Sequence, residues 1–232
     1  MYLYLVRHFE SEKNLAGTLS TTSDNEPLTE VGKRRCEKFA RALCEEIGTR
    51  PNQNPLILTS SSSRSQETAE IITAGFPHPE VRVCPFLRST NAGPFAGLSS
   101  AKIRRANRNW YDSFIMYKAG LLNMYEFESG SLAIGAESKR AFEHRVLGGV
   151  LPIISEASDR DLVIIGNRSS ITAILLYFAR RYYGYPRGFY GYVRVSLGAV
   201  TIIRRLSGNG WQFVKVNARS PRTAECDGIA VK

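Results

Sequence analysis

Apolar positions along the chain follow strand and helix periods in alternation. Residues 2–7 (YLYLVR) predict a strand, and the continuous apolar runs at 55–59 and 162–165 are typical of strands buried on both faces. Apolar residues recur at helical spacing over 31–47, and Thr29 stands where an N-cap is expected. The chain therefore reads as strands separated by amphipathic helices.

The remaining elements continue this alternation, apart from one segment. They are a polar loop at 15–27, a helix capped by residues 60–63, a strand at 81–86, a helix near 137–155, a helix from about Ile171, and two strands near 193–204 and 211–217. The aromatic and basic segment 99–135 predicts a lid, helical at first and then loop-like, inserted into a single domain spanning 1–232. The order predicts an α/β three-layer sandwich, with a mainly parallel central sheet and helices on both faces.

Charge narrows the classes of ligand. The 232 residues are 43% hydrophobic, enough for a sizeable core, and carry a net charge of +10. A basic balance favours an anionic ligand: a phosphorylated metabolite, a nucleic acid or an acidic membrane surface. The basic residues occur in short, scattered clusters and no nucleic-acid-binding motif accompanies them, so we expect no nucleic-acid partner.

Cysteine usage and the absence of long apolar runs limit the expected cofactors and the expected location in the cell. Cys36, Cys44, Cys84 and Cys226 form no Cys-x-x-Cys pair, and no His lies at metal-ligand spacing from them. We therefore expect neither a metal nor a cofactor. No apolar run reaches about 18 residues and no secretory leader is apparent, so we expect a cytoplasmic protein with reduced thiols and no membrane partner.

Candidate catalytic and binding residues follow the ends of three predicted strands. Arg7 and His8 follow the first strand, residues 60–64 follow the second, and residues 166–170 follow the run at 162–165. Ligands of open α/β sheets bind at the carboxyl ends of the strands. A nucleophilic imidazole beside a guanidinium at that edge indicates an anion site.

Five motifs in order carry a resemblance that runs over nearly the whole chain. LVRHFESEKN resembles the LVRHGES…N signature of the histidine phosphatase superfamily, which includes the cofactor-dependent phosphoglycerate mutases. TSSSSRSQETAEII is similar to its second, Arg-containing motif, and LRSTNAGPFAG to its LRExxFGxxEG segment. GAESKRAFEHRV is similar to its Gly-Glu-Ser…Arg helix, and VIIGNRSSITAIL to its VxxxSHGGxIRAL motif.

The resemblance implies a phosphate site and a reaction. His8 matches the nucleophile that forms a phosphohistidine, and Arg7 and Arg64 match the arginines that clamp the phosphoryl oxygens. Ser11 and Asn14 match further polar ligands of the same phosphate. Guanidinium forks suit phosphoryl oxygens, and covalent catalysis divides one hydrolysis into two easier steps. The implied partner is a small phosphorylated substrate or ligand.

Several positions depart from the family pattern. The second catalytic His aligns with Asn167, or with Arg168 after a shift of one residue, and either side chain can contact phosphate. The acid Glu aligns with Ser89. Glu137 and Glu10 are substitute acid candidates, although helix capping or salt bridging is the favoured role for each. A further departure is Phe9, which stands where the motif has Gly.

Three alternatives are left open by these residues. The first is a phosphomonoesterase acting through His8, with a basic, aromatic insertion (Arg104, Arg105, Arg108, Trp110, Tyr117) shaping the pocket mouth or simply packing its own aromatics. The second is a non-catalytic protein that binds a phosphorylated ligand or partner. The third is that Asn167 is an introduced His→Asn change. Mutase activity is less favoured, and a homodimer formed by edge strands is an open expectation.

Overall fold

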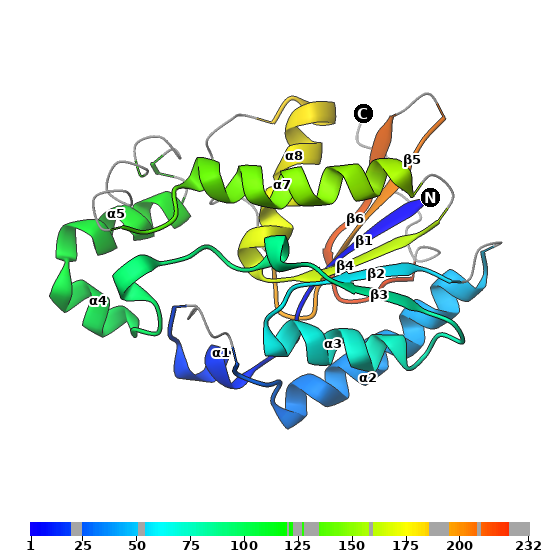
Figure 1. Cartoon of the computed structure of the whole chain (residues 1–232), viewed down its shortest axis with the longest axis horizontal. Helices are drawn as coiled ribbons and strands as arrows, with labels where there is room; N and C mark the ends of the chain where they lie inside the picture. Colours follow the sequence, from blue (N-terminus) through cyan, green and yellow to red (C-terminus); the bar gives the residue numbers. More distant parts are fainter. Residues whose placement is uncertain are drawn as a thin grey trace.

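A central sheet organises the chain (Figure 1). The computed structural model describes residues 1–19, 25–50, 54–119, 121–122, 127, 135–157, 160–185, 195–207 and 210–222. Within these ranges one sheet has the strand order β3-β2-β4-β1-β5-β6. Its strands are β1 (Tyr2–Arg7), β2 (Leu56–Thr59), β3 (Glu80–Val83), β4 (Leu162–Gly166), β5 (Val200–Arg205) and β6 (Trp211–Ala218).

The directions of the strands bring three strand ends together. β1 pairs with β4, β4 with β2, and β2 with β3, all in parallel, whereas β5 and β6 are antiparallel. The register sets Arg7 opposite Gly166 and Thr59 opposite Ile165. The mainly parallel sheet is confirmed, and the carboxyl ends of β1, β2 and β4 lie at one edge.

Strand periodicity divides the apolar residues between two cores. Leu3 and Leu5 of β1 face α7 (Lys139–Glu156) and α8 (Arg168–Tyr183). Tyr4 and Val6 face α2 (Glu30–Gly48) and α3 (Ser63–Thr73) on the other side. Successive strand side chains point to opposite faces, so a strand that is apolar at every position is covered on both. The three-layer arrangement is therefore confirmed, with α7 and α8 above the sheet and α2 and α3 below it in Figure 1.

The structure corrects several element boundaries. Part of the expected loop at 15–27 belongs to α1 (Glu12–Ala16), a helix too short to show a periodic stripe. The helix expected from Ile171 begins at Arg168, because Asn167 takes the N-cap position and the first turn is polar. The third strand ends at Val83, and a 3₁₀ helix, η1 (Pro85–Leu87), follows it.

The first of the two C-terminal strands starts later than the sequence predicts. β5 begins at Val200 rather than near 193, and residues 195–199 form a bend that contains Gly198 at φ +66°. This left-handed conformation favours glycine. The expected turn between the last two strands lies at 207–210, of which residues 208 and 209 are outside the described residues.

The segment 99–135 begins with helices, as expected. They are α4 (Ser100–Ala106) and α5 (Arg108–Lys118), which follow the 3₁₀ helix η2 (Gly93–Phe95); much of 120–134 lies outside the described residues. Buried side chains from these elements form a small separate core: Phe95, Ile103, Trp110, Tyr117 and Phe127. Figure 1 shows α4 and α5 standing away from the sheet. The single domain and the lid role of this segment stay predictions.

The described residues also bear on three expectations, which concern membrane-spanning helices, metal-binding groups and cysteine thiols. No described helix combines the length and apolarity that crossing a bilayer needs. Among the described residues, no group of three His, Cys, Asp or Glu side chains could hold a metal ion. Cys36, Cys44 and Cys84 are free thiols, and Cys226 lies outside the described residues. Oligomeric state and location in the cell stay predictions.

Candidate active site

Backbone hydrogen bonds tie three strand ends into one site. The amide of His8 donates to the Gly166 carbonyl at 3.1 Å, and the amide of Ser60 donates to the Ile165 carbonyl at 3.0 Å. The side chains that follow β1, β2 and β4 therefore project from one edge of the sheet. The predicted convergence of Arg7-His8, Arg64 and Asn167 is observed.

His8 is a buried imidazole whose ring orientation is fixed. Its Nδ1 lies 2.7 Å from its neighbour's carbonyl, that of Phe9, to which it donates, so the lone pair is on Nε2. Burial, and then the positive charges of Arg64 and Arg7, hold the pKa of His8 well below its usual range. The ring is therefore neutral at neutral pH, the protonation state that a nucleophilic imidazole needs.

Arg64 connects the three strand ends through its guanidinium. It is 1% exposed, and its Nε lies 3.3 Å from Nε2 of His8. Its Nη2 donates to Oδ1 of Asn167 at 2.6 Å. Its Nη1 lies 3.4 Å from a carboxylate oxygen of Glu26, a residue that the sequence reading did not select. A phosphoryl group at His8 would meet the fork of this guanidinium.

The residues after β1 divide into cavity-lining and supporting groups. Arg7 and Asn14 line the cavity, and Arg7 Nη1 donates to the Val195 carbonyl at 2.8 Å. Ser11, expected to bind phosphate, is fully buried outside the cavity lining; its hydroxyl donates to Asn14 Oδ1 at 2.8 Å. Ser11 thus orients Asn14, because it lies at the N-cap of α1 and faces inward.

Lys13 is a buried cation of the site that sequence reasoning missed. It is 7% exposed and lines the same cavity as Arg7 and His8. Its place depends on α1, which has no sequence periodicity, so no signal in the chain could have found it. Together with Arg7, Arg64 and Arg168, it makes the cavity strongly positive.

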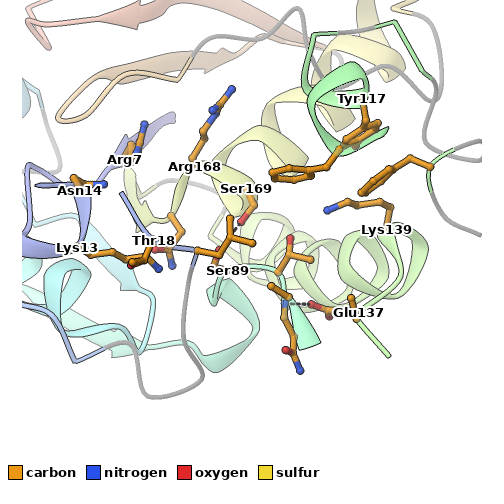
Figure 2. A pocket seen from close by; sticks show the side chains of 18 of the residues that line it. Arg7, Lys13, Asn14, Thr18, Ser89, Tyr117, Glu137, Lys139, Arg168 and Ser169 are labelled. Atoms are coloured by element: carbon orange, nitrogen blue, oxygen red, sulfur yellow. Dashed lines mark hydrogen bonds between the residues drawn. The ribbon is translucent and has the colours of Figure 1, made fainter. Parts of the chain in front are cut away.

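The cavity extends from Arg7 at the end of β1 to Tyr117 of α5 (Figure 2). Its volume is about 250 Å³. Arg7, Lys13 and Asn14 lie on one side, Tyr117 and Lys139 lie on the other, and Ser89 and Ser169 lie between them. The segment 99–135 contributes aromatic rings, from Trp110, Phe114, Tyr117 and Phe127. Arg104, Arg105 and Arg108, expected at the pocket mouth, are exposed and do not line the cavity.

Known proteins are similar to this chain in sequence and in fold. The family model of the histidine phosphatase superfamily (branch 1) matches residues 3–219. The chain belongs to the histidine phosphatase superfamily. A probable phosphoglycerate mutase, GpmB of Photorhabdus laumondii, is 38% identical over 93 residues, which span 40% of each protein.

Solved structures share the histidine phosphatase fold over almost their full lengths. Bacillus stearothermophilus YhfR has a TM-score of 0.76 at 21% identity, covering 96% of this chain and 98% of that protein. The alpha-ribazole phosphatase of Shigella flexneri has a TM-score of 0.75 at 18% identity, covering 95% and 98%. The mycobacterial glucosyl-3-phosphoglycerate phosphatase has a TM-score of 0.72 at 18% identity, covering 94% and 99%.

The side chain of Asn167 is held by two partners in this member of the superfamily. Besides accepting from Arg64, it donates from Nδ2 to the Ser60 hydroxyl at 3.3 Å. Its backbone amide donates to the Ser170 hydroxyl at 3.1 Å, which closes the first turn of α8. Asn is a favourable N-cap residue, so the side chain both begins a helix and positions Arg64. Its neighbour Arg168 lines the cavity.

The acid candidates are placed differently from one another. Glu137 lines the cavity, but its two carboxylate oxygens accept from Arg145 at 2.9 and 2.8 Å. Arg145 also donates to the Phe86 carbonyl at 2.8 Å, so this ion pair fixes the segment that leads to Ser89. Glu10 does not line the cavity and accepts from the Thr29 hydroxyl at 2.9 Å. Both carboxylates thus have structural partners, the role the sequence reading favoured.

Phe9 fits beside His8 because Gly198 has no side chain. The ring is 5% exposed, packs edge-on against Phe39 at 5.6 Å between centroids, and belongs to the core under α2. A Cβ on Gly198 would lie 2.4 Å from Cε1 of Phe9. The bulky residue therefore points into the core and leaves the cavity open.

Proposed function

We propose that the protein is a phosphatase that hydrolyses small phosphomonoesters through a phosphohistidine at His8. The observation that carries this proposal is the fixed, neutral imidazole with its Nε2 lone pair beside Arg64. Related fold members whose names are alpha-ribazole phosphatase and glucosyl-3-phosphoglycerate phosphatase support the reaction class. The positive cavity supports an anionic substrate.

The reaction has two steps with separate demands on the site. In the first, Nε2 of His8 attacks phosphorus, the bond to the ester oxygen breaks, and the leaving alkoxide takes a proton from water. In the second, water attacks the phosphohistidine, releases inorganic phosphate and restores the imidazole. Arg7 and Arg64 hold the phosphoryl oxygens in both, because spread negative charge is what fixed guanidinium groups stabilise.

The residues at 89 and 167 favour a slow enzyme with a preference for good leaving groups. Ser89 forms a hydrogen bond with Ser169 at 3.2 Å and cannot supply a proton as a carboxylic acid does. Loss of a general acid costs about 10²–10⁴-fold in rate, and least for esters whose alcohol leaves as a stable anion. Aryl phosphates should therefore be hydrolysed faster than alkyl phosphates.

Phosphatase assays with p-nitrophenyl phosphate and a panel of sugar, glycerate and nucleoside phosphates test the proposal. The purified protein should hydrolyse at least the aryl ester, and His8→Ala should abolish turnover. His144→Ala is the matched control, since His144 is exposed and does not line the cavity. An acid-labile phosphohistidine should appear by phosphorus NMR in the parent only. Turnover that persists in His8→Ala would contradict the proposal.

The second candidate is a binding protein with the same pocket and no turnover. It is favoured by the contacts of Arg64, whose three nitrogens face His8, Asn167 and Glu26. Calorimetry with orthovanadate, a phosphate mimic, separates the two candidates. Binding that Arg64→Met removes, in a protein without turnover on any ester, would support the binding role.

A further inference from the structure

Lys139 stands apart from the phosphate-holding residues of the site. It occupies the first position of α7, after the N-cap Ser138, and lines the cavity on the side opposite Arg7 (Figure 2). Its Nζ lies 5.7 Å from the centre of the Tyr117 ring and 5.9 Å from that of Phe127. Lys139 therefore belongs to the far wall of the cavity.

The position of this ammonium is unfavourable for stability. A cation in the first turn of a helix opposes the helix dipole, and α7 begins with Lys139. Burial lowers the pKa of Lys139 to about 8. Ring contacts near 6 Å are at the outer limit of cation–π attraction and stabilise weakly. Packing alone does not explain a charged side chain here.

The nearby carboxylates are committed to other partners. Glu137 and Glu143 both attract Lys139 electrostatically. Glu137 pairs with Arg145 at 2.8 Å, and Glu143 pairs with Arg180 at 3.2 Å. Among the described residues, Lys139 has ring contacts but no hydrogen bond or ion pair. Its positive charge is therefore available to a ligand.

The cavity has room for more than a phosphoryl group. Its volume of about 250 Å³ compares with about 30 Å³ for one water in the liquid. A phosphoryl group at His8 would leave the part of the cavity beside Ser89 and Lys139 for the rest of the substrate. A ligand that spans the cavity would meet Arg7 and Arg64 at one end and Lys139 at the other.

We propose that Lys139, over the rings of Tyr117 and Phe127, binds a second anionic group of the substrate. The preferred substrates are then short phosphomonoesters that also carry a carboxylate or a second phosphate. This inference rests on the proposed function, since it takes the first anionic group to be the phosphoryl at His8. Lys139 would choose among substrates without taking part in bond breaking.

Non-hydrolysable ligands test the inference without turnover. We would use phosphonates joined to a carboxylate by a short, an intermediate and a long methylene chain, each matched with its neutral carboxamide, and a parallel series with a second phosphonate. Calorimetry gives Kd for the full-length protein, for Lys139→Met, and for the matched control Lys102→Met. Lys102 is exposed and does not line the cavity, so the control removes the same charge elsewhere.

The expected result is a gain that depends on Lys139. For at least one chain length, the dianionic ligand should bind the parent about tenfold more tightly than its carboxamide, equal to about 1.4 kcal/mol. Lys139→Met should remove that gain and keep the carboxamide affinity, whereas Lys102→Met should keep both. The two series show whether carboxylate or phosphonate is preferred.

The experiment distinguishes failure of the Lys139 subsite from failure of the phosphate pocket. If the carboxamides bind the parent but neither second anion adds affinity at any length, the Lys139 subsite is wrong and the phosphate pocket stands. The subsite is equally wrong if the gain survives in Lys139→Met. If no phosphonate binds the parent, the phosphate pocket itself is wrong and the subsite falls with it.

Discussion

Nη2 of Arg64 lies 2.6 Å from Oδ1 of Asn167 and joins the helix that follows β2 to the helix that follows β4. An amide oxygen accepts from a guanidinium without carrying charge, so Asn167 positions Arg64 and leaves the positive charge for a ligand. A histidine in its place would add a group that can carry charge and donate to phosphate. The chemistry of the site therefore depends on which of the two residues is present.

Asn167→His should raise phosphatase activity. A second imidazole near the phosphoryl group would supply charge and a proton donor, a contribution of about 10²–10⁴-fold in rate. We expect kcat on p-nitrophenyl phosphate to rise by about 10²-fold or more, with helix stability lowered by about 1 kcal/mol because the Asn cap is lost. Arg168→His is the control, because the motif can also be aligned one residue later. A gain in Arg168→His and none in Asn167→His would show that the other register is correct.

His8 should stay neutral at mildly acidic pH. Burial and the charges of Arg64, Arg7 and Lys13 hold its pKa well below the usual value, and only the Phe9 carbonyl opposes them. Imidazole NMR signals assigned by difference with His8→Gln should show that His8 takes up a proton only well below the ordinary value of about 6.5.

The same shift of the His8 pKa affects stability. The unfolded chain takes up a proton below about pH 6.5 that folded His8 does not, so His8 lowers stability progressively below that pH. Urea unfolding should show a smaller acid-induced loss of stability in His8→Gln than in the parent. An equal loss in both proteins would contradict the burial of a neutral imidazole.

Gly198→Ala should destabilise the protein. The substitution places a Cβ against the Phe9 ring and forces alanine to φ +66°, so we expect a loss of about 2 kcal/mol or more in the free energy of unfolding. Gly148→Ala is the control, since Gly148 lies in α7 with open space around it and should gain about 0.5–1 kcal/mol. Similar effects of the two substitutions would contradict the described packing of Phe9.

Lys139→Met should stabilise the protein while weakening its recognition of dianions. Removing a desolvated charge from the start of α7 should raise Tm, at about 2–4 °C per kcal/mol for a chain of this size. Because the pKa of Lys139 is lowered to about 8, the unfolded chain holds more protons between that pH and about 10.4, so the parent should gain stability relative to the variant over this range. The groups that face Lys139 are Glu137, Glu143 and Tyr117, and the two carboxylates pair with Arg145 and Arg180.

Calorimetric scans of the parent, Lys139→Met and Lys102→Met across this pH range check the expectation. The exposed Lys102 should leave Tm nearly unchanged. A marked fall in Tm for Lys139→Met would mean that the ammonium supports the aromatic rings, and that its position is structural.

The sheet and the strand ends are predictable from the sequence because both depend on local patterns. The fully apolar run at 162–165 required cover on both faces, and Arg7-His8 followed a strand within the first eight residues. The side chains that define the rest of the cavity depend on tertiary contacts. The position of Lys13 depends on α1, a helix without sequence periodicity, and Glu26 approaches Arg64 from 38 residues away in the chain.

Phe9, which stands where the family motif has Gly, also shows that side-chain positions set by tertiary contacts cannot be predicted from the sequence. A bulky residue after the nucleophile reads as an obstruction in the sequence, because nothing in the chain shows where its ring points. Its partner, Gly198, is far away in sequence and lies in a bend that was expected to be part of a strand. Only the folded chain shows that the two positions compensate each other.

The backbone of His8 is anchored on two sides, by its amide to the Gly166 carbonyl and by its carbonyl to the Gly198 amide at 3.2 Å. His8 is therefore part of the sheet edge, and its backbone cannot move toward a ligand. Adaptation to ligands of different size must come from side chains on the rest of the cavity wall, such as those of Ser89 and Lys139, and from the rings of Trp110 and Tyr117. Substrate range in this protein should accordingly change by substitutions around the rim of the cavity, while the phosphoryl end stays the same.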